Sequence, residues 1–117
     1  MTLNQVQALA DGICRAYKVP PIKIEVSDRF PACGGSACYI TRSFKIRGKI
    51  LHKNLPVKII IYEWSAKKKY PGEVVYHLGH ELAHHIRNIK AKSLAHNRAF
   101  YKLEDEVCIR LNRKIKV

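Results

Sequence analysis

The sequence predicts a single α+β domain over residues 1–117, because helical and strand periodicities occupy separate stretches of the chain. Near both ends, apolar residues recur every three or four positions, which is the pattern of helices buried on one face. Between these regions, apolar and charged residues alternate, which is the pattern of half-buried strands. We expect an N-terminal helix, a sheet of about three strands and two further helices, over residues 2–17, 22–26, 37–51, 57–64, 71–90 and 93–112.

The N-terminal helix is indicated by apolar residues at helical spacing, such as Val6 and Ile13. Either Thr2 or Asn4 can cap its first turn, since both side chains carry an oxygen that accepts from backbone N–H groups. The prolines at positions 20 and 21 end the helix, because proline cannot continue the hydrogen-bond ladder.

Three stretches predict the strands. Residues 22–26 alternate between apolar and charged side chains, and Val57–Trp64 contains a run of three isoleucines that indicates a more buried strand. Residues 37–51 predict one strand in which apolar and basic residues have opposite parity, with Gly48 as a bulge. The apolar set is Phe44, Ile46 and Ile50, and the basic set is Lys45, Arg47 and Lys49. We therefore expect a basic stripe on one face of that strand.

Two helices follow the strands. Pro71 suits the first turn of a helix that runs to about Lys90, and Ser93 is a candidate cap for a last helix that reaches about Asn112.

The net charge of +13 is large for 117 residues and is unevenly distributed. No acidic residue lies between Asp28 and Glu63, a stretch that is rich in lysine and arginine. Such a stretch attracts polyanions, so we expect it to contact nucleic acid, with DNA as a partner; the alternative is a solvated basic surface. The expected contacts are Arg42, Lys45, Arg47, Lys49 and Lys53.

The chain contains no run of about 18 apolar residues and no N-terminal secretory pattern. We therefore expect a cytoplasmic protein without a membrane segment. Of the four cysteines, Cys14 and Cys108 fall in expected helices and are interpreted as buried thiols. Cys33 and Cys38 flank a glycine-containing loop, and whether they form a disulfide is left open.

The sequence His80-Glu81-Leu82-Ala83-His84 has the spacing of a zinc-binding helix. Histidines four residues apart lie on one face of a helix, so both imidazoles can reach one Zn²⁺ ion. The glutamate between them is then placed to act as a general base. Both histidines fall away from the apolar stripe that contains Leu78 and Leu82, as expected of side chains that line a cleft.

A catalytic zinc site needs a third protein ligand and one open position. His96 is the favoured third ligand, because it begins the inward apolar stripe of the last helix. Glu104, on the edge of the same stripe, is the alternative ligand. We expect His77 to contact substrate or one of the metal ligands and not to bind the ion itself, and we expect His52 and His85 to be structural.

The segment from Pro71 to His84, followed by His96-x-x-x-Phe100, resembles the SprT-like metallopeptidases and their YgjP-like and WLM relatives. The resemblance extends to the order of elements over nearly the whole chain, and Asn97 departs from the glycine usual in that family. It implies a minimal zincin-like fold, one catalytic Zn²⁺ held by the motif histidines and His96, and Glu81 as the catalytic base. It also implies hydrolysis of peptide bonds, including those of DNA-associated or DNA-crosslinked proteins.

Within that interpretation, a peptide substrate would extend along an exposed sheet edge, for which we expect Val57–Trp64. Tyr62, Tyr76 and Tyr101 are the candidate donors to the oxyanion, and the sequence does not choose among them. Two other interpretations remain: a regulatory protease similar to the ImmA/IrrE type with Glu104 as third ligand, and a non-catalytic nucleic-acid-binding domain with structural zinc.

Overall fold

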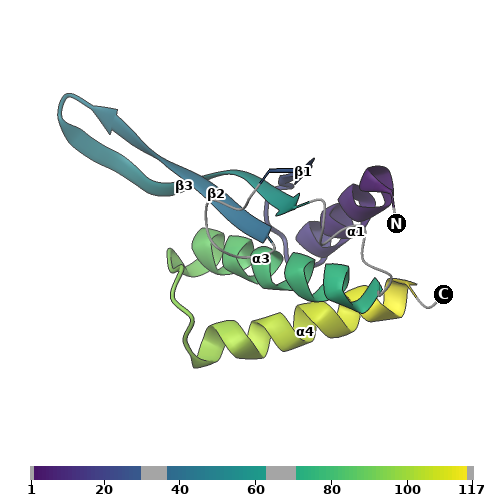
Figure 1. The fold of residues 1–117 in the computed structure, drawn as a ribbon. Helices are drawn as coiled ribbons and strands as arrows, with labels where there is room; N and C mark the ends of the chain where they lie inside the picture. The colour runs from purple at the N-terminus through teal and green to yellow at the C-terminus, as the bar shows by residue number, and fades with distance from the viewer. Residues whose placement is uncertain (1, 30–36, 63–70, 116–117) are drawn as a thin grey trace.

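The computed structural model describes residues 2–29, 37–62 and 71–115, without the side chains of residues 51, 52 and 71–73. Its element order is α1 (Leu3–Ala16), β1 (Lys23–Ser27), β2 (Ala37–Ile46), β3 (Lys49–Tyr62), α3 (Pro71–Ala91) and α4 (Arg98–Ile115) (Figure 1). The α+β class is confirmed: helices pack against a mixed sheet, with the strands and the helices in separate parts of the chain. Within the described ranges, no helix is both long and apolar enough to cross a lipid bilayer.

Helix α1 begins with a capping box. The hydroxyl of Thr2 accepts from the Gln5 backbone N–H at 3.2 Å, and the Thr2 N–H donates to the Gln5 side chain at 2.8 Å. Two N–H groups that the helix leaves without partners are thereby satisfied. Thr2, rather than Asn4, is therefore the cap.

The sheet has the order β1-β3-β2 in its described strands, with β3 parallel to β1 and antiparallel to β2. This order corrects two expectations. Residues 57–62 of the expected strand Val57–Trp64 do not form an exposed edge, since they belong to β3, the central strand of the described sheet, and β2 forms one of its two edges. Residues 63 and 64 lie outside the described residues. Residues 37–51 do not form one strand, since the chain reverses at Arg47-Gly48 and β3 already begins at Lys49.

The reversal at Arg47-Gly48 has a local cause. Both residues have positive φ, 52° and 77°, as a two-residue hairpin turn of type I′ requires. Gly48 adopts this conformation without strain because it has no Cβ. Gly48 is therefore a turn residue and not a bulge; the irregularities in pairing lie along β2, between Ile40 and Lys45.

The turn also redistributes the basic residues. Partners across an antiparallel pair share a face of the sheet. Lys45 pairs with Ile50, and Ile46 pairs with Lys49, so each face of the hairpin end carries both a cation and an apolar side chain. The expectation of a basic stripe on one face is wrong, because it assumed one continuous strand. The hairpin formed by β2 and β3 extends well beyond the helices (Figure 1), and the molecule measures 49 × 30 × 25 Å.

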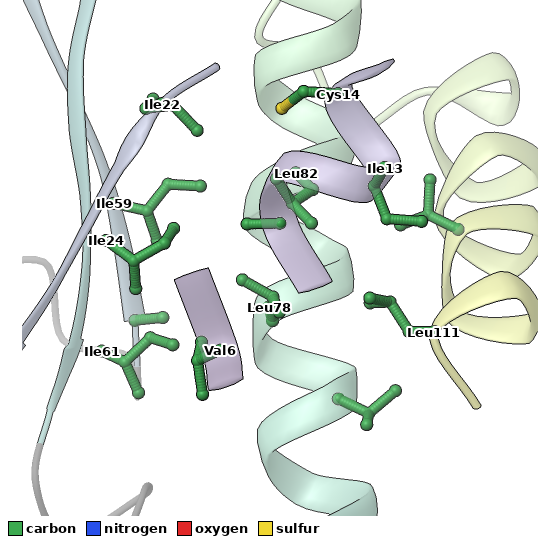
Figure 2. Close-up of a cluster of buried hydrophobic side chains, with 14 of the residues drawn as sticks. Val6, Ile13, Cys14, Ile22, Ile24, Ile59, Ile61, Leu78, Leu82 and Leu111 are labelled. Carbon is green, nitrogen blue, oxygen red and sulfur yellow. The ribbon is translucent and has the colours of Figure 1, made fainter. Parts of the chain in front are cut away.

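The core lies between the sheet and the helices, with α3 packed against the sheet, α1 and α4. Figure 2 shows isoleucines of the sheet facing side chains of α1 and α3, while Leu111 approaches from α4. Helices α3 and α4 approach closely at Gly79, where an added Cβ would lie 2.4 Å from the sulfur of Cys108. The labelled core side chains are Val6, Ile13, Cys14, Ile22, Ile24, Ile59, Ile61, Leu78, Leu82 and Leu111.

The cysteines follow the expected pattern in part. Cys14 is a buried free thiol, and Cys108 is a free thiol that is only half-buried. Cys33 lies outside the described residues, so the prediction about a disulfide between Cys33 and Cys38 stays open.

Candidate metal centre

The motif histidines project from adjacent turns of α3, and His96 approaches them from the connection to α4. The ring centroids of His80 and His84 are 4.9 Å apart, and His96 lies 5.0 Å from the first and 4.7 Å from the second. One nitrogen from each ring can be chosen so that all three lie within 4.8 Å of one another. The three histidines named from the sequence therefore form one cluster that could hold a metal ion.

His96 reaches the cluster because of how α4 begins. The side chain of Asn97 accepts from the Phe100 backbone N–H at 3.0 Å, which makes Asn97 the cap of α4. The prediction that Ser93 caps this helix is wrong. The Ser93 hydroxyl instead accepts from the backbone N–H of Ala95, within the connection between α3 and α4. His96 therefore precedes the helix, and it does not lie in the first turn as the periodicity indicated.

Phe100 forms an apolar support beneath the cluster. It is fully buried, and its ring centroid lies 4.5–5.0 Å from the centroids of all three imidazoles. Contacts with one buried ring restrict the rotation of the histidines before any ion binds. In the sequence, the spacing of His96 and Phe100 in the His-x-x-x-Phe pattern was the feature that pointed to Phe100.

The cluster fits a transition-metal ion. Nε2 of His84 and Nε2 of His96 are 2.8 Å apart. Tetrahedral zinc with bonds near 2.0–2.1 Å separates ligand nitrogens by about 3.3 Å, so small side-chain adjustments suffice. Burial lowers the pKa of His84 to about 4, with further lowering from His80 and His96. His84 is therefore neutral at neutral pH, which is the form that binds metal.

The carboxylate of Glu104 contacts a histidine of the cluster and does not belong to the group of side chains that could bind the ion. It is buried on α4, and its Oε2 lies 2.5 Å from Nδ1 of His80. A carboxylate at this position accepts a hydrogen bond from the protonated Nδ1. The other ring nitrogen, Nε2, then keeps its lone pair for an ion. Among the described residues, the group that could hold a metal ion, which we call the metal-holding group, contains the three histidines and not Glu104.

Glu81 lies beside the cluster and is 7% exposed. Burial raises its pKa to about 8; a hydrogen bond from the Tyr39 backbone opposes this rise, and the charge of Glu104 adds to it. A carboxyl group with such a pKa exchanges protons readily near neutral pH.

A cavity of about 550 Å³ opens between the beginning of β2 and α3. Glu81 and all three clustered histidines line it, together with His77. Of the three candidate oxyanion donors, Tyr76 lines this cavity. Tyr62 is buried beside Cys38, and Tyr101 is exposed on α4. The remaining lining residues are Ala37, Cys38, Tyr39, Ile40, Tyr76 and Leu94.

Tyr39 is a site residue that sequence reasoning missed. Its ring is stacked parallel to that of His84 at 6.5 Å, and its hydroxyl lies 2.9 Å from Nδ1 of His85. Because Nε2 of His85 contacts the carbonyl oxygen of Pro20 at 2.8 Å, Nε2 carries the proton and Nδ1 accepts from Tyr39. Asn88 in turn donates to the Tyr39 hydroxyl at 3.0 Å. No motif or spacing in the sequence connected Tyr39 with the histidines.

This network makes His85 a buried structural histidine, as expected from the sequence. Burial lowers the pKa of His85, and the hydrogen bond to the Pro20 carbonyl opposes this shift. The side chain of His52 is outside the described residues. His77 lines the cavity without belonging to the metal-holding group.

We expect Tyr39→Phe to lower the free energy of unfolding by about 1–3 kcal/mol, since it removes one partner from buried polar groups. His85 loses its donor at Nδ1, and Asn88 loses an acceptor. Urea denaturation of the metal-free protein measures the change. Tyr101→Phe, on an exposed side chain, is the matched control and should have little effect. Equal stability of the two variants would contradict the network.

The five expected nucleic-acid contacts lie together, but away from the cavity. All five side chains are exposed on the projecting β2–β3 hairpin and none lines the cavity. The residues are Arg42, Lys45, Arg47, Lys49 and Lys53. The cavity is lined by residues 37–40 at the start of β2, whereas the basic residues begin at Arg42 and continue towards the turn.

Comparison of the chain with family models, with curated proteins and with solved structures found no match in any of the three.

Proposed function

We propose that this protein is a zinc-dependent metallopeptidase of the His-Glu-x-x-His type. The observation that carries the proposal is the shared cavity: it is lined by Glu81 and by three histidines whose nitrogens lie within 4.8 Å of one another. Three imidazole ligands leave a tetrahedral ion one open position, as in catalytic zinc sites and unlike structural sites with four protein ligands.

Each residue has a distinct role in the proposed reaction. His80, His84 and His96 would hold the ion, and Glu104 would fix the orientation of His80. When bound, Zn²⁺ would supply a Lewis acid that polarises a carbonyl group and lowers the pKa of water. Glu81 would accept the proton of the attacking water on its carboxylate and deliver it to the leaving amine.

The substrate would be an extended peptide lying between β2 and α3. β2 is an edge strand of the described sheet, and its residues Tyr39 and Ile40 line the same cavity as Glu81. An edge strand offers backbone groups to a peptide that adds as a further strand. Tyr76 would donate to the oxyanion, since it lies on the opposite side of the cavity from β2, with its ring 6.4 Å from that of His80.

The alternatives receive less support. A regulatory protease of the ImmA/IrrE type would need Glu104 on the metal, whereas its carboxylate contacts Nδ1 of His80. A structural zinc site would leave the buried Glu81 and the cavity beside it without a role. DNA-associated proteins remain the narrower substrate class of the proposal, supported by the exposed basic residues of the hairpin.

Removal of the metal tests the proposal. A chelator should abolish hydrolysis of fluorescently labelled, unfolded casein, and one equivalent of Zn²⁺ should restore it. Activity is measured by fluorescence, and bound zinc by atomic emission on the same samples. A magnesium addition serves as the control, because three imidazoles do not suit that ion. Hydrolysis that persists in the metal-free protein would contradict the proposal.

A further inference from the structure

The projecting end of the β2–β3 hairpin is a second feature that the peptidase chemistry does not use. We call residues 42–53 the arm; it extends away from the helices into solvent (Figure 1). It contains no acidic residue and five exposed cations. None of these cations forms an ion pair within the part of the chain that the structure describes. By contrast Lys58, nearer the body on β3, pairs with Glu25 at 2.9 Å.

Large apolar side chains are exposed between these cations. Phe44 is 51% exposed, and Ile46 and Ile50 are each 48% exposed. Because Lys45 pairs with Ile50 and Lys49 with Ile46, both faces of the arm are mixed in this way. The arm therefore lacks the single apolar face that would pack against a protein surface.

We propose that the arm binds in the major groove of double-stranded DNA. The groove of B-form DNA is about 12 Å wide and admits a two-stranded β-ribbon. Cations on both faces of the ribbon can then reach the phosphates on both sides of the groove. Ile46 and Ile50, the exposed isoleucines nearest the tip, are suited to contact the methyl groups of thymine on the groove floor.

The length of the arm fits this placement. From Arg42 to Arg47, an extended strand spans about 17 Å, which exceeds the groove depth of about 8.5 Å. The tip can therefore reach the base edges while the helices stay outside the duplex. The narrow major groove of A-form RNA would exclude the same ribbon.

The order of residues along the arm argues against a lipid surface. Arg47 stands in the turn at the tip, and Lys49 follows directly, whereas Phe44 lies further back. Insertion into a bilayer would carry these charges ahead of the apolar side chains, at a high desolvation cost. Phosphates that flank a groove instead favour cations at the tip and along both edges.

Duplex binding is tested with a triple variant of the arm, Lys45→Gln, Arg47→Asn and Lys49→Gln. Asparagine is chosen at position 47 because it tolerates the positive φ of the turn. The matched control removes three exposed cations from the helices, by Lys90→Gln, Lys102→Gln and Arg113→Gln. Fluorescence anisotropy with a labelled 20-base-pair DNA duplex measures affinity across a series of salt concentrations.

We expect the arm variant to bind the duplex at least ten-fold more weakly, while the control changes less than three-fold. A plot of the logarithm of the binding constant against the logarithm of the salt concentration should become shallower, by about 0.9 for each phosphate that the variant no longer neutralises. Ile46→Ala should weaken binding by roughly three- to ten-fold with little change in that slope, because it removes an apolar interaction with the bases beside the tip.

Three results would overturn the assignment. The first is an equal loss of affinity in the arm and control variants, which would indicate diffuse attraction by net charge. The second is binding of an RNA duplex or of phosphatidylserine-containing vesicles as tight as that of DNA. The third is absence of duplex binding by the unaltered protein at low salt.

Discussion

Glu81→Gln is expected to lower the rate of peptide hydrolysis by roughly 10²- to 10⁴-fold, the usual contribution of a general acid–base group. The amide has the shape of the carboxyl group but cannot accept the proton of an attacking water. Because burial raises the pKa of Glu81 to about 8, the site already accommodates an uncharged group there, so the fold should persist.

The same variant should bind zinc as the unaltered protein does, since the metal-holding group consists of three histidines without Glu81. Turnover of a quenched fluorescent peptide and bound zinc are measured on one sample. Asp105→Asn, which neutralises an exposed carboxylate on α4, is the control and should keep full activity. A fully active Glu81→Gln protein that holds zinc would refute the proposed mechanism.

His96→Ala and Glu104→Ala are expected to affect zinc binding to different extents. His96→Ala removes one of three ligands and should abolish stoichiometric binding at micromolar zinc. Glu104→Ala removes only the partner of His80 and should weaken binding by about 10- to 100-fold, as is typical for groups that orient a ligand. Competition with a chromogenic chelator measures both affinities.

Glu104→Gln separates orientation from ligation. Its amide oxygen can still accept from Nδ1 of His80, so this variant should bind zinc more tightly than Glu104→Ala. Circular dichroism checks that each variant is folded. If Glu104→Ala lost the metal while His96→Ala kept it, Glu104 would be the third ligand, as in the alternative considered from the sequence.

The histidine cluster was predicted because its chemistry is local. His80 and His84 are fixed by helical spacing, which depends only on positions within one element. His96 was identified for a partly incorrect reason, because it lies before α4 and not in its first turn. Its position depends on Asn97 as the cap, and Ser93 competed for that role in the sequence.

The features that the sequence did not predict are non-local. Strand order depends on pairings between distant residues, so the isoleucine run indicated a buried strand but not that residues 57–62 lie at the centre of the described sheet. The alternation from Phe44 to Ile50 continues across the turn, and an arginine with positive φ is an uncommon turn residue. The same alternation therefore fits a single strand and a hairpin.

The Arg47-Gly48 turn limits how the length of the arm can change during evolution. Removing or adding one residue on each strand beside the turn would reverse which side chains face each way at the tip. Changes of two residues on each strand would keep the alternation and move the tip by about 7 Å. Since His80 and His84 lie on α3 and His96 lies in the connection to α4, such changes would leave the histidine cluster in place. The length of the arm can therefore change in steps of two residues on each strand without altering the histidine cluster.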